Sequence, residues 1–583
     1  MSGREQAALD QLISELLLKN AIRQCLPVPD QFISPVFLEP KPDGSFRLIL
    51  NVKQLNAFID TEHFKLEDYR VASRLITPSC FLAKLDLRDA YYTVSVHPDF
   101  RKYLRFSVNG ILYEFTCLPF GLCTAPYVFT KIMRPVVATL RQKGFKSVVY
   151  LDDFLLLGRT KRECSENVAE TCMLLARLGF LFNKQKCHYP PSTVCQFLGF
   201  EFNTVETSLS LPREKREKIK NLICLTSRLK SCKIQQFARF LGSLTSICPA
   251  IQYGWAYTKA FERDKYLALL RANGDYQAYM QLPDRTLEYS WWSLHIFSSS
   301  TSLLPKSFAL EIFSDASLEG WGASCQGMTA RGTWTPTERE FHINQLELLA
   351  ALFALQSFTK NLSNVDILLR IDNTTAIAYI NRMGGIRFPH LSSIALQIWQ
   401  YCEKSHLFVV ASYINSLDNT TADKESRKLD SETEYELSST AFHCIISHLG
   451  RPDIDLFASR KNHKCSRYVS WKCDPGSEMV DAFTISWTQE KFYAFPPFTL
   501  IPRVLQKIIK DKATGIVVVP NWPAQPWFPL FQDLLVSQTI ELSPSINLLR
   551  SVDRFPHPLY KKLSLVAGRL SGKVSNNEIF QQQ

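Results

Sequence analysis

Strands that end in an acidic residue recur along the chain and alternate with helical stretches. The segments Phe81–Asp86, Phe308–Asp315 and Val365–Asp372 each read as an apolar strand that closes on an aspartate. In Val148–Leu157 two apolar runs flank an Asp-Asp pair, which predicts a tight hairpin with acids at its tip. By contrast, Ile343–Lys360 reads as a helix. The pattern predicts an α+β multidomain protein with carboxylates at its strand ends.

Changes in composition divide the chain into segments. Pro27 and Pro29 predict the end of an N-terminal helix, because proline cannot continue a helix. Pro212 opens a basic helical stretch, since Arg213–Arg239 holds nine Lys and Arg against two Glu. Ser298–Thr301 reads as a short linker. The predicted segments are a helical extension at 1–30, a mixed segment at 31–204, a helical segment at 205–300, an α/β domain at 307–428 and a Trp- and Pro-rich domain at 440–583.

The composition narrows the class of protein. The 583 residues suggest three to five domains, and 46% hydrophobic with 21% charged residues excludes a disordered, collagenous or simple coiled-coil chain. A net charge of +12 favours a polyanionic partner, with nucleic acid the first expectation. The 16 cysteines are scattered without a C-x-x-C pair, and neither a membrane-spanning run nor a signal peptide is evident. We therefore expect an intracellular protein, cytoplasmic, nuclear or both, without a membrane partner.

The first set of candidate catalytic residues is Asp86, Asp152 and Asp153. Adjacent acids between hydrophobic strands cost stability unless a cation neutralises them. Hard carboxylate oxygens suit Mg²⁺, and two such ions stabilise the attacking and leaving oxygens of phosphoryl transfer. An isolated Asp-Asp pair, however, is most often a solvated turn, so the surrounding motifs decide between the two interpretations.

Five motifs appear in the order that is typical of one family. They are K-P-D-G-x-x-R from Lys41 to Arg47, L-D-L-R-D-A-Y ending at Tyr91, L-P-F-G-L-x-x-A-P at 118–126, Y-L-D-D at 150–153 and F-L-G at 197–199. This set resembles the reverse transcriptases over roughly Phe32–Phe202. The resemblance implies a right-hand polymerase, with fingers and palm at 31–204 and thumb and connection at 205–300.

The resemblance also implies roles for individual residues. The three aspartates would hold the metals, and Lys41 and Arg47 would grip the triphosphate of the incoming nucleotide. Tyr91 would exclude a ribose 2′-OH and Phe120 would line the nucleotide pocket; the alternative is that both are plain core aromatics. Lys186, rather than its neighbour Lys184, would donate a proton to the leaving pyrophosphate.

A basic helix after Pro212 is the candidate nucleic-acid-binding element. Its cations recur at helical spacing and would track the phosphates of a template–primer duplex, the residues concerned being Arg213, Lys215, Arg216, Lys218 and Lys220. The alternative is a solvated charged face, because Glu214 and Glu217 provide partners within the helix.

A second set of four acids follows in strand–helix–strand–helix order: Asp315, Glu347, Asp372 and Asp423. Glu347 has only small residues (Ala350, Ala351, Ala354) at i+3, i+4 and i+7, so its helix can lie close to a sheet. Asn373 is placed to cap the next helix. The order resembles ribonuclease H over about 307–428, which implies two Mg²⁺ ions and hydrolysis of RNA in an RNA–DNA hybrid. Tyr413 stands where related elements often carry an assisting histidine.

The remaining motifs indicate a lineage. The motifs at Asn344–Ala350 and Arg451–Ser459 resemble those of retrotransposons of the DIRS/Ngaro type. This resemblance implies that a tyrosine recombinase and a nucleocapsid-like protein are encoded elsewhere in the element. In such elements the C-terminal region resembles an adenine-DNA methyltransferase. Strands are expected at 454–457, 480–483, 495–498 and 516–520. Because Phe495 replaces the acid or amide before Pro-Pro and a Gly-rich loop is lacking, a degenerate α/β domain is favoured over an active methyltransferase.

Together these observations predict an RNA-directed DNA polymerase with ribonuclease H activity. Its cofactors would be Mg²⁺ or Mn²⁺, two ions per active site. Its partners would be an RNA template, a DNA primer, the RNA–DNA hybrid and deoxynucleoside triphosphates. One alternative is a domesticated, catalytically silent nucleic-acid-binding protein. Another is a DNA-templated polymerase or nuclease, which a downstream ribonuclease H argues against.

Overall fold

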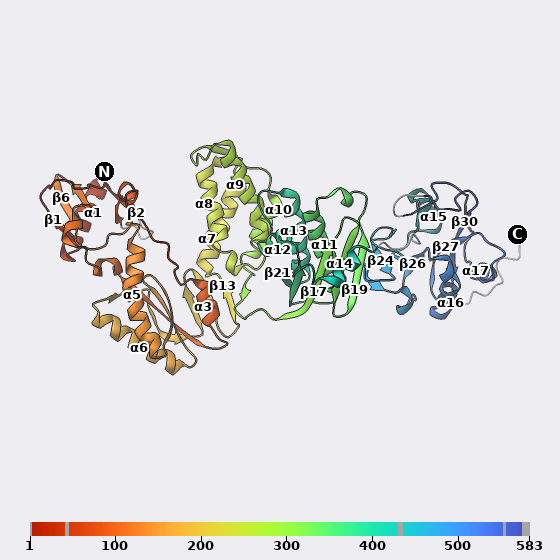
Figure 1. Ribbon diagram of the computed structural model, residues 1–583, viewed down its shortest axis with the longest axis horizontal. Coiled ribbons are helices and arrows are strands. Elements are labelled where there is room, and N and C mark those ends of the chain that lie inside the picture. Colours follow the sequence, from red (N-terminus) through yellow and green to blue (C-terminus); the bar gives the residue numbers. More distant parts are fainter. Residues whose placement is uncertain (1–2, 41–45, 429–434, 552–555, 574–583) are drawn as a thin grey trace. The chain divides into compact units, whose positions relative to one another are not determined.

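The computed structural model describes residues 3–40, 46–428, 435–551 and 556–573 (Figure 1). The chain divides into two compact units, namely Met1–Lys230 with Gly242–Gly254 and Asp284–Pro305, and Ser231–Leu241 with Trp255–Pro283 and Lys306–Gln583. The segment 205–300, expected to form thumb and connection, is therefore shared between the two units. Within the described residues, no helix combines the length and apolar character that a membrane crossing needs.

The N-terminal helix is shorter than the prolines predict. Helix α1 (Gly3–Leu18) ends well before Pro27, and β1 (Ile22–Gln24) then pairs antiparallel with β6 (Ile111–Phe115). Ile22 is buried in the core that also holds Phe115. The prediction of a helix over 1–30 was wrong because burial of Ile22 in a sheet, and not the first proline, ends the helix.

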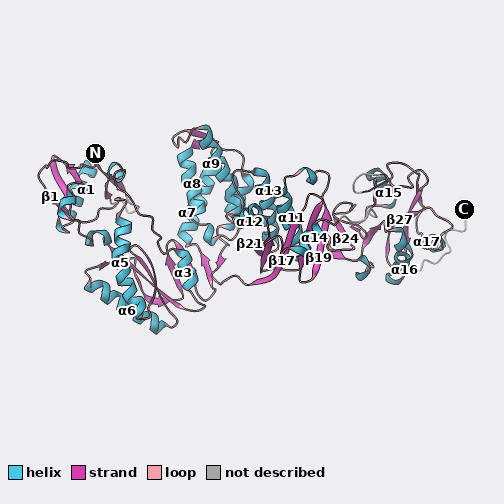
Figure 2. Ribbon diagram, viewed as in Figure 1, coloured by secondary structure: helices cyan, strands magenta, loops and turns pink. Residues whose placement is uncertain are grey.

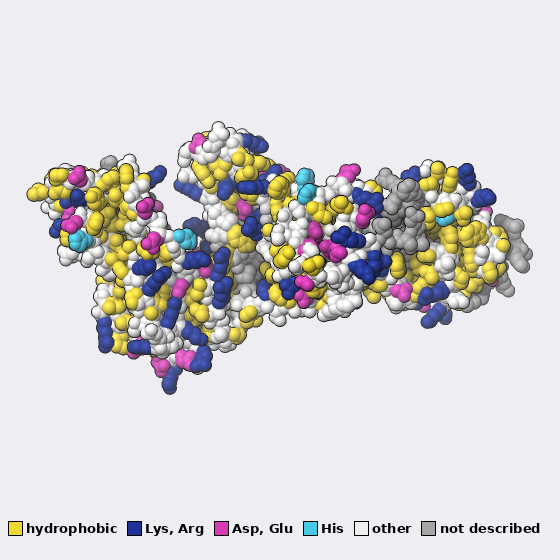
Figure 3. Space-filling view, in the orientation of Figure 1, with side chains coloured by type: hydrophobic (Ala, Val, Ile, Leu, Met, Phe, Trp, Pro, Cys, Tyr) yellow, Lys and Arg dark blue, Asp and Glu magenta, His cyan; other side chains and the backbone are white. Residues whose placement is uncertain are grey.

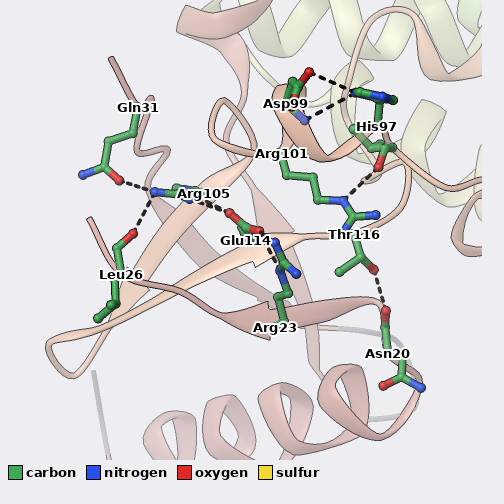
Figure 4. A network of polar contacts seen from close by, with 11 residues as sticks. Asn20, Arg23, Leu26, Gln31, His97, Asp99, Arg101, Arg105, Glu114 and Thr116 are labelled. Carbon is green, nitrogen blue, oxygen red and sulfur yellow. Dashed lines mark hydrogen bonds and ion pairs between the residues drawn. The ribbon is translucent and has the colours of Figure 1, made fainter. Parts of the chain in front are cut away.

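A buried ion-pair network ties the N-terminal segment to this three-stranded sheet, β1-β6-β5 (Figure 4). On β5 (Arg105–Val108), Arg105 stands opposite Glu114 and donates to its carboxylate at 2.6 Å. Arg23 reaches the other oxygen of Glu114 at 2.6 Å, and Arg105 also donates to Gln31 at 2.7 Å. Burial alone would raise the pKa of Glu114, but the two guanidinium groups lower it below its usual value.

The central sheet of this unit has the order β10-β4-β8-β7, with β9 also paired to β4. Leu85 and Phe154 face a core that Phe129 and Leu175 complete from two helices. Figure 2 shows these two helices, α5 and α6, beside the strands of the sheet. The elements are β4 (Phe81–Arg88), α5 (Ala125–Gln142), β7 (Lys146–Tyr150), β8 (Asp153–Gly158), α6 (Lys161–Arg177), β9 (Leu181–Phe182) and β10 (His188–Ser192). On the other face of the two strands, Asp86 lies opposite Asp153, next to buried leucines of β8.

The remaining elements of the first unit flank this sheet in sequence. A four-stranded sheet has the order β11-β12-β13-β16, and α7 packs against α10. The helices are α2 (Lys53–Asn56), α3 (Tyr69–Leu75), α4 (Pro98–Arg101), α7 (Arg213–Ser227) and α10 (Thr286–His295). The strands are β2 (Val36–Pro40), β3 (Phe46–Leu50), β11 (Val194–Phe197), β12 (Phe200–Asn203), β13 (Ser208–Ser210) and β16 (Thr301–Ser302).

In the second unit, a mixed five-stranded sheet has the order β19-β18-β17-β20-β21. Its first three strands are antiparallel neighbours, while β17, β20 and β21 run parallel. The elements are β17 (Phe308–Ala316), β18 (Gly320–Cys325), β19 (Met328–Thr333), α11 (Ile343–Phe358), β20 (Val365–Ile371), α12 (Thr374–Asn381), α13 (Pro389–Lys404), β21 (Leu407–Tyr413) and α14 (Thr420–Ser426). Upstream lie β14 (Ser231–Lys233), α9 (Lys259–Arg271) and β15 (Tyr279–Gln281), and α8 (Ile234–Thr245) crosses the unit boundary.

The C-terminal part of this unit is a seven-stranded sheet in the order β25-β24-β23-β26-β27-β30-β28. Its first five strands are parallel and the last two are antiparallel to their neighbours. The strands are β23 (Ile454–Asp455), β24 (Arg467–Ser470), β25 (Met479–Val480), β26 (Lys491–Ala494), β27 (Thr514–Pro520), β28 (Ile540–Leu542) and β30 (Leu565–Ser571). The helices are α15 (Ser439–Leu449), α16 (Ile501–Asp511) and α17 (Phe528–Asp533), and β22 (Tyr435–Leu437) pairs with β29 (Leu549–Ser551).

Two of the four strand predictions for the C-terminal domain were wrong. The segment 480–483 is a strand only at its first residue, because Asp481 accepts a hydrogen bond from Phe483 N and starts a 3₁₀ turn. The segment 495–498 is the loop after β26, where two prolines lack the amide hydrogen that a strand ladder requires. The strands at 454 and 516 are present, although the first is shorter than expected.

Candidate active sites

Asp86, Asp152 and Asp153, called the palm acids below, meet where β4 and the β7–β8 hairpin lie side by side. Asp86 stands directly opposite Asp153 in the antiparallel register, and Asp152 lies in the turn that precedes Asp153. Because side chains alternate along a strand, Asp86 lies on the face of β4 opposite to core residues Leu85 and Leu87. The predicted hairpin with acids at its tip is confirmed.

The hairpin turn is backbone-strained. Leu151 has φ 55°, in the left-handed region that bulky residues rarely adopt. A positive φ at the first central residue suits a two-residue hairpin turn, whose twist matches that of the flanking strands. Such strain persists only where the surrounding structure imposes it, and here it places Asp152 beside the β4 ladder, where its carbonyl accepts a hydrogen bond from Leu87 N at 3.0 Å.

Two lysines partly neutralise the palm acids. Lys186 Nζ lies 3.5 Å from Asp86, and Lys84 Nζ lies 3.2 Å from Asp153. Burial raises the pKa of Asp86, Lys186 opposes that shift and Asp153 adds to it. Burial likewise raises the pKa of Asp152. Lys84 was missed from the sequence, although its position two residues before Asp86 puts it on the same strand face.

Tyr91 and Phe120 form one aromatic group next to the acids. Their ring centroids lie 5.1 Å apart, and Tyr91 also packs edge-on against Phe129 at 5.5 Å. Burial, with the charge of Asp152 adding to it, raises the pKa of Tyr91 to about 12. Phe120 is 45% exposed, which a plain core aromatic would not be.

Of the two residues expected to hold the triphosphate, Arg47 and Lys41, the structure describes only Arg47. Arg47 is exposed on β3, opposite Glu39 on β2. Lys41 lies outside the described residues.

Some cations of the basic helix α7 make contacts within the protein, whereas others are exposed to solvent. Lys215 donates to Gly199 O at 3.1 Å and lies over the Phe200 ring, and burial lowers its pKa. Arg216 donates to the carbonyls of Leu211 and Phe297.

The other cations of this helix are more open. Arg213 pairs with Glu217 at 2.9 Å, as an intrahelical partner would. Lys218 and Lys220 are exposed, and Lys220 Nζ lies over the Phe297 ring. Figure 3 shows Lys and Arg side chains at many separate places on the visible face, interspersed with Asp and Glu.

The second set of acids gathers at the carboxyl ends of β17 and β20. Carboxylate oxygens of Asp315, Glu347 and Asp372 lie within 4.8 Å of one another. Of the residues that the structure describes, this is the one trio of His, Cys, Asp or Glu drawn together so closely; the palm acids are more widely spread. Burial, followed by the charges of Asp315 and Asp372, raises the pKa of Glu347 to about 9. Burial also raises the pKa of Asp315.

This trio fits a metal ion. Asp315 Oδ2 and Glu347 Oε2 are buried and have no hydrogen-bond partner. Buried carboxylate oxygens without partners are costly unless a cation or a proton satisfies them. Oxygen-only donors suit Mg²⁺ or Mn²⁺.

The fourth acid lies close to the trio but outside it. Asp423, on α14, accepts two hydrogen bonds from Arg427 at 2.9 and 2.6 Å, and its charge adds to the raised pKa of Asp315. Gly322 on β18 permits this arrangement, because a Cβ there would come within 2.2 Å of Ala422 O. The sequence pattern around Gly322 did not indicate this close approach of helix to sheet.

The helix cap at the second site is as the sequence predicts. The polar contacts there between residues far apart in the sequence were not predicted. Asn373 caps α12 by accepting from Ala376 N at 2.9 Å, as predicted. Asn373 also donates to Asn344 at 2.9 Å, and Ser416 donates to Asp372 at 2.6 Å. Tyr413, at the position of the assisting histidine, is 56% exposed.

Comparison with known proteins gives a family for part of the chain. Residues 39–202 match the family model described as reverse transcriptase (RNA-dependent DNA polymerase). The chain is 23% identical over 449 residues to a putative enzymatic polyprotein of Cassava vein mosaic virus and 24% identical over 452 residues to the enzymatic polyprotein of Cauliflower mosaic virus (strain CM-1841). These alignments cover 72% and 74% of this chain but 65% and 62% of the viral polyproteins. The Tf2-3 transposon polyprotein of Schizosaccharomyces pombe is 25% identical over 201 residues, covering 34% of this chain and 15% of its own length.

Among solved structures, similarity is found to a foamy viral protease–reverse transcriptase. Its complex with an RNA/DNA hybrid matches with a TM-score of 0.46 and 16% identity, covering 75% of this chain and 58% of that chain. A complex with double-stranded DNA matches with a TM-score of 0.45 and 17% identity, covering 70% of each chain. The family match spans the three palm acids and the aromatic pair. Residues 39–202 are therefore a reverse transcriptase domain, of the kind carried by viral and retrotransposon polyproteins.

Proposed function

We propose that the chain is an RNA-directed DNA polymerase that also removes RNA from the RNA–DNA hybrid it makes. One observation carries the polymerase: Asp86 faces Asp153 in register, with Asp152 at the strained turn, inside the segment that matches the reverse transcriptase model. Two acids that face each other on adjacent strands, with a third in the turn next to Tyr91, suit phosphoryl transfer better than structural support.

In the palm, Asp86, Asp152 and Asp153 would hold two divalent cations, Mg²⁺ or Mn²⁺. The cations, when bound, would neutralise charge on the attacking and leaving oxygens. Two of the chain's own cations have separate tasks. Lys84 orients Asp153, from which it lies 3.2 Å away. Lys186, 64% exposed and 3.5 Å from Asp86, is free to turn toward a leaving pyrophosphate.

Substrate contacts follow from the same geometry. Tyr91 would lie under the sugar of a deoxynucleotide, with Phe120 beside it, because the Tyr91 ring is fixed by Phe129 on one side. Arg47 and Lys41 would bind the triphosphate. The exposed cations Lys218 and Lys220 of α7, with the other basic residues of that helix, would track the template–primer phosphates.

Hybrid cleavage would take place at the trio of Asp315, Glu347 and Asp372, with Asp423 as the fourth acid. Support comes from the two unpartnered buried oxygens and from the raised pKa of Glu347, which a bound cation would reverse. The partners would be an RNA template, a DNA primer, the hybrid and deoxynucleoside triphosphates.

Finer assignments belong to the same proposal. The element would be of the DIRS/Ngaro type, with a tyrosine recombinase and a nucleocapsid-like protein as partners, and the protein would act in the cytoplasm, the nucleus or both. The C-terminal sheet would be a degenerate methyltransferase-like domain, since Phe495 follows β26 where an acid or amide is needed and the loop after β23 has no glycine.

Primer extension tests the proposal. Purified full-length protein should extend a DNA primer on an RNA template with Mg²⁺ and deoxynucleotides, and a chelator should stop it. Extension on DNA templates alone would favour the DNA-templated alternative. Hybrid binding without extension or cleavage would favour the catalytically silent binding protein.

A further inference from the structure

The loop that follows β23 has an unusual composition for its position in the C-terminal sheet. The strand order reverses between β23 and β26, and open α/β sheets bind ligands at the carboxyl ends of the strands at such a point. Phosphate-binding loops there use glycines for close backbone approach and a helix N-terminus. The segment Leu456–Ser466, called the docking loop below, has no glycine and leads to β24 without a helix.

The docking loop instead contacts the ribonuclease H-like domain through Arg460. Its guanidinium binds both carboxylate oxygens of Glu338, at 2.8 and 3.1 Å, and lies 4.3 Å from the centroid of the Phe353 ring. The Arg460 and Glu338 side chains are only 20% and 15% exposed. Burial alone would raise the pKa of Glu338, but Arg460 holds it below its usual value. Such a bidentate, partly desolvated pair is geometrically specific.

A second contact crosses at the other end of the same helix. Lys360, just beyond α11, donates to Asp474 O and to Ser477 Oγ, both at 2.7 Å. Asp474 is buried, and its carboxylate accepts from Arg460 N at 3.0 Å and from Tyr468 at 2.7 Å. The two contacts are therefore joined through one aspartate.

Both contacts converge on α11, the helix that carries Glu347. Glu338 lies shortly before the helix, Phe353 within it and Lys360 just after it. Phe353 is six residues beyond Glu347, so the two side chains point to different sides of the helix. The contacts thus lie before, within and after the helix, and the one at Phe353 is about 120° around the helix axis from Glu347.

We propose that the docking loop has taken the place of a cofactor loop and serves to hold α11, with Arg460 as a positioning residue for Glu347. The C-terminal domain would then be required for the ribonuclease H-like site and not for the polymerase site. The effect on hybrid cleavage rests on the proposed function, whereas the effect on α11 and on its metal site does not.

The test compares full-length variants by hydrogen–deuterium exchange of α11 and by Mn²⁺ binding to the trio, followed by electron paramagnetic resonance. Each protein also carries Asp152→Asn, so that the palm does not contribute to Mn²⁺ binding. Arg460→Glu and Glu338→Arg should each speed exchange of the α11 amides and weaken Mn²⁺ binding, by about tenfold or more. The double variant restores the pair with reversed polarity and should recover most of both.

Arg467→Met is the matched control. Arg467 follows the docking loop and makes equally short ion pairs, to Glu478 and Glu490 within the C-terminal domain. It should leave α11 and Mn²⁺ binding unchanged. If Arg460→Glu does not fold, Arg460→Lys, which keeps the charge but loses the bidentate geometry, should give a smaller change in the same direction.

The proposal would be overturned if both single variants exchanged their α11 amides and bound Mn²⁺ as the wild-type protein does. A double variant no better than the single variants would also overturn it, because the pair itself would then not matter. If the wild-type protein cleaves no hybrid while α11 still responds as expected, the proposed function fails and the docking role stands.

Discussion

Replacing Glu347 with Gln should change how metal binding at the second site depends on pH. Burial and the neighbouring acids Asp315 and Asp372 raise the pKa of Glu347 to about 9, so the metal-free site holds a proton on Glu347 at neutral pH. A divalent cation must displace that proton before the Glu347 carboxylate can bind the cation. Metal binding is therefore expected to release a proton.

The structure sets the size of the effect. Between about pH 6 and pH 8, which lie below a pKa of about 9, the proton on Glu347 makes metal affinity rise about tenfold, or about 1.4 kcal/mol, per pH unit. Glu347→Gln removes this proton. The variant should therefore bind the metal more weakly than wild type, and its plot of log metal affinity against pH should be about one unit shallower in slope.

The same pKa has a consequence for stability without metal. The folded protein keeps a proton that the unfolded chain releases above about pH 4.5, so stability is present below that pH and falls as pH rises toward about 9. Glu347→Gln should therefore stabilise the metal-free protein at pH 8 and not at pH 4.

Calorimetric titration with Mn²⁺ at several pH values measures the linkage directly. Each protein also carries Asp152→Asn to remove the palm site, and buffers of different ionisation enthalpy report the protons released. Glu340→Gln, an exposed acid shortly before α11, is the control and should behave as wild type. Parallel pH slopes for the Glu347→Gln and wild-type proteins would refute the reasoning.

Three further changes have defined outcomes. Tyr91→Ala should raise ribonucleotide incorporation relative to deoxynucleotide by about 10–200-fold in competition assays, unless the ring is only a core aromatic. Lys218→Gln with Lys220→Gln should flatten the plot of log affinity for an RNA–DNA primer-template against log salt by up to about two units, and parallel slopes would mean that these cations face water. Glu114→Ala should lower stability by about 3–5 kcal/mol in denaturant titrations, because it leaves the buried Arg105 unpaired; an unchanged midpoint would contradict this.

Local sequence patterns were sufficient to predict how the acids are placed at strand ends and in the hairpin turn. Alternation along β4 puts Asp86 on the face opposite to Leu85 and Leu87, and the two apolar runs that flank the Asp-Asp pair predict the hairpin from sequence alone. The small face of α11 (Ala350, Ala351, Ala354) is fully buried, as its spacing predicts. These features depend on residues a few positions apart.

Long-range contacts were beyond the sequence. Lys84 with Asp153, Ser416 with Asp372 and Arg460 with Glu338 join residues 44 to 122 positions apart, so the pairing cannot be identified from the neighbours of either residue in sequence. The early end of α1 has the same cause, because pairing of β1 with β6 overrides the helical pattern. Tertiary packing, not propensity, decides such cases.

The most direct test of the account is one pair of substitutions measured in two assays. Asp152→Asn keeps the shape of the hairpin tip but removes a charge that would hold metal, so primer extension on RNA should fall by several orders of magnitude while hybrid cleavage persists. Asp315→Asn should do the reverse, because the two groups of acids lie in separate units. Near-wild-type extension by Asp152→Asn would contradict the assignment of the palm acids as the polymerase site.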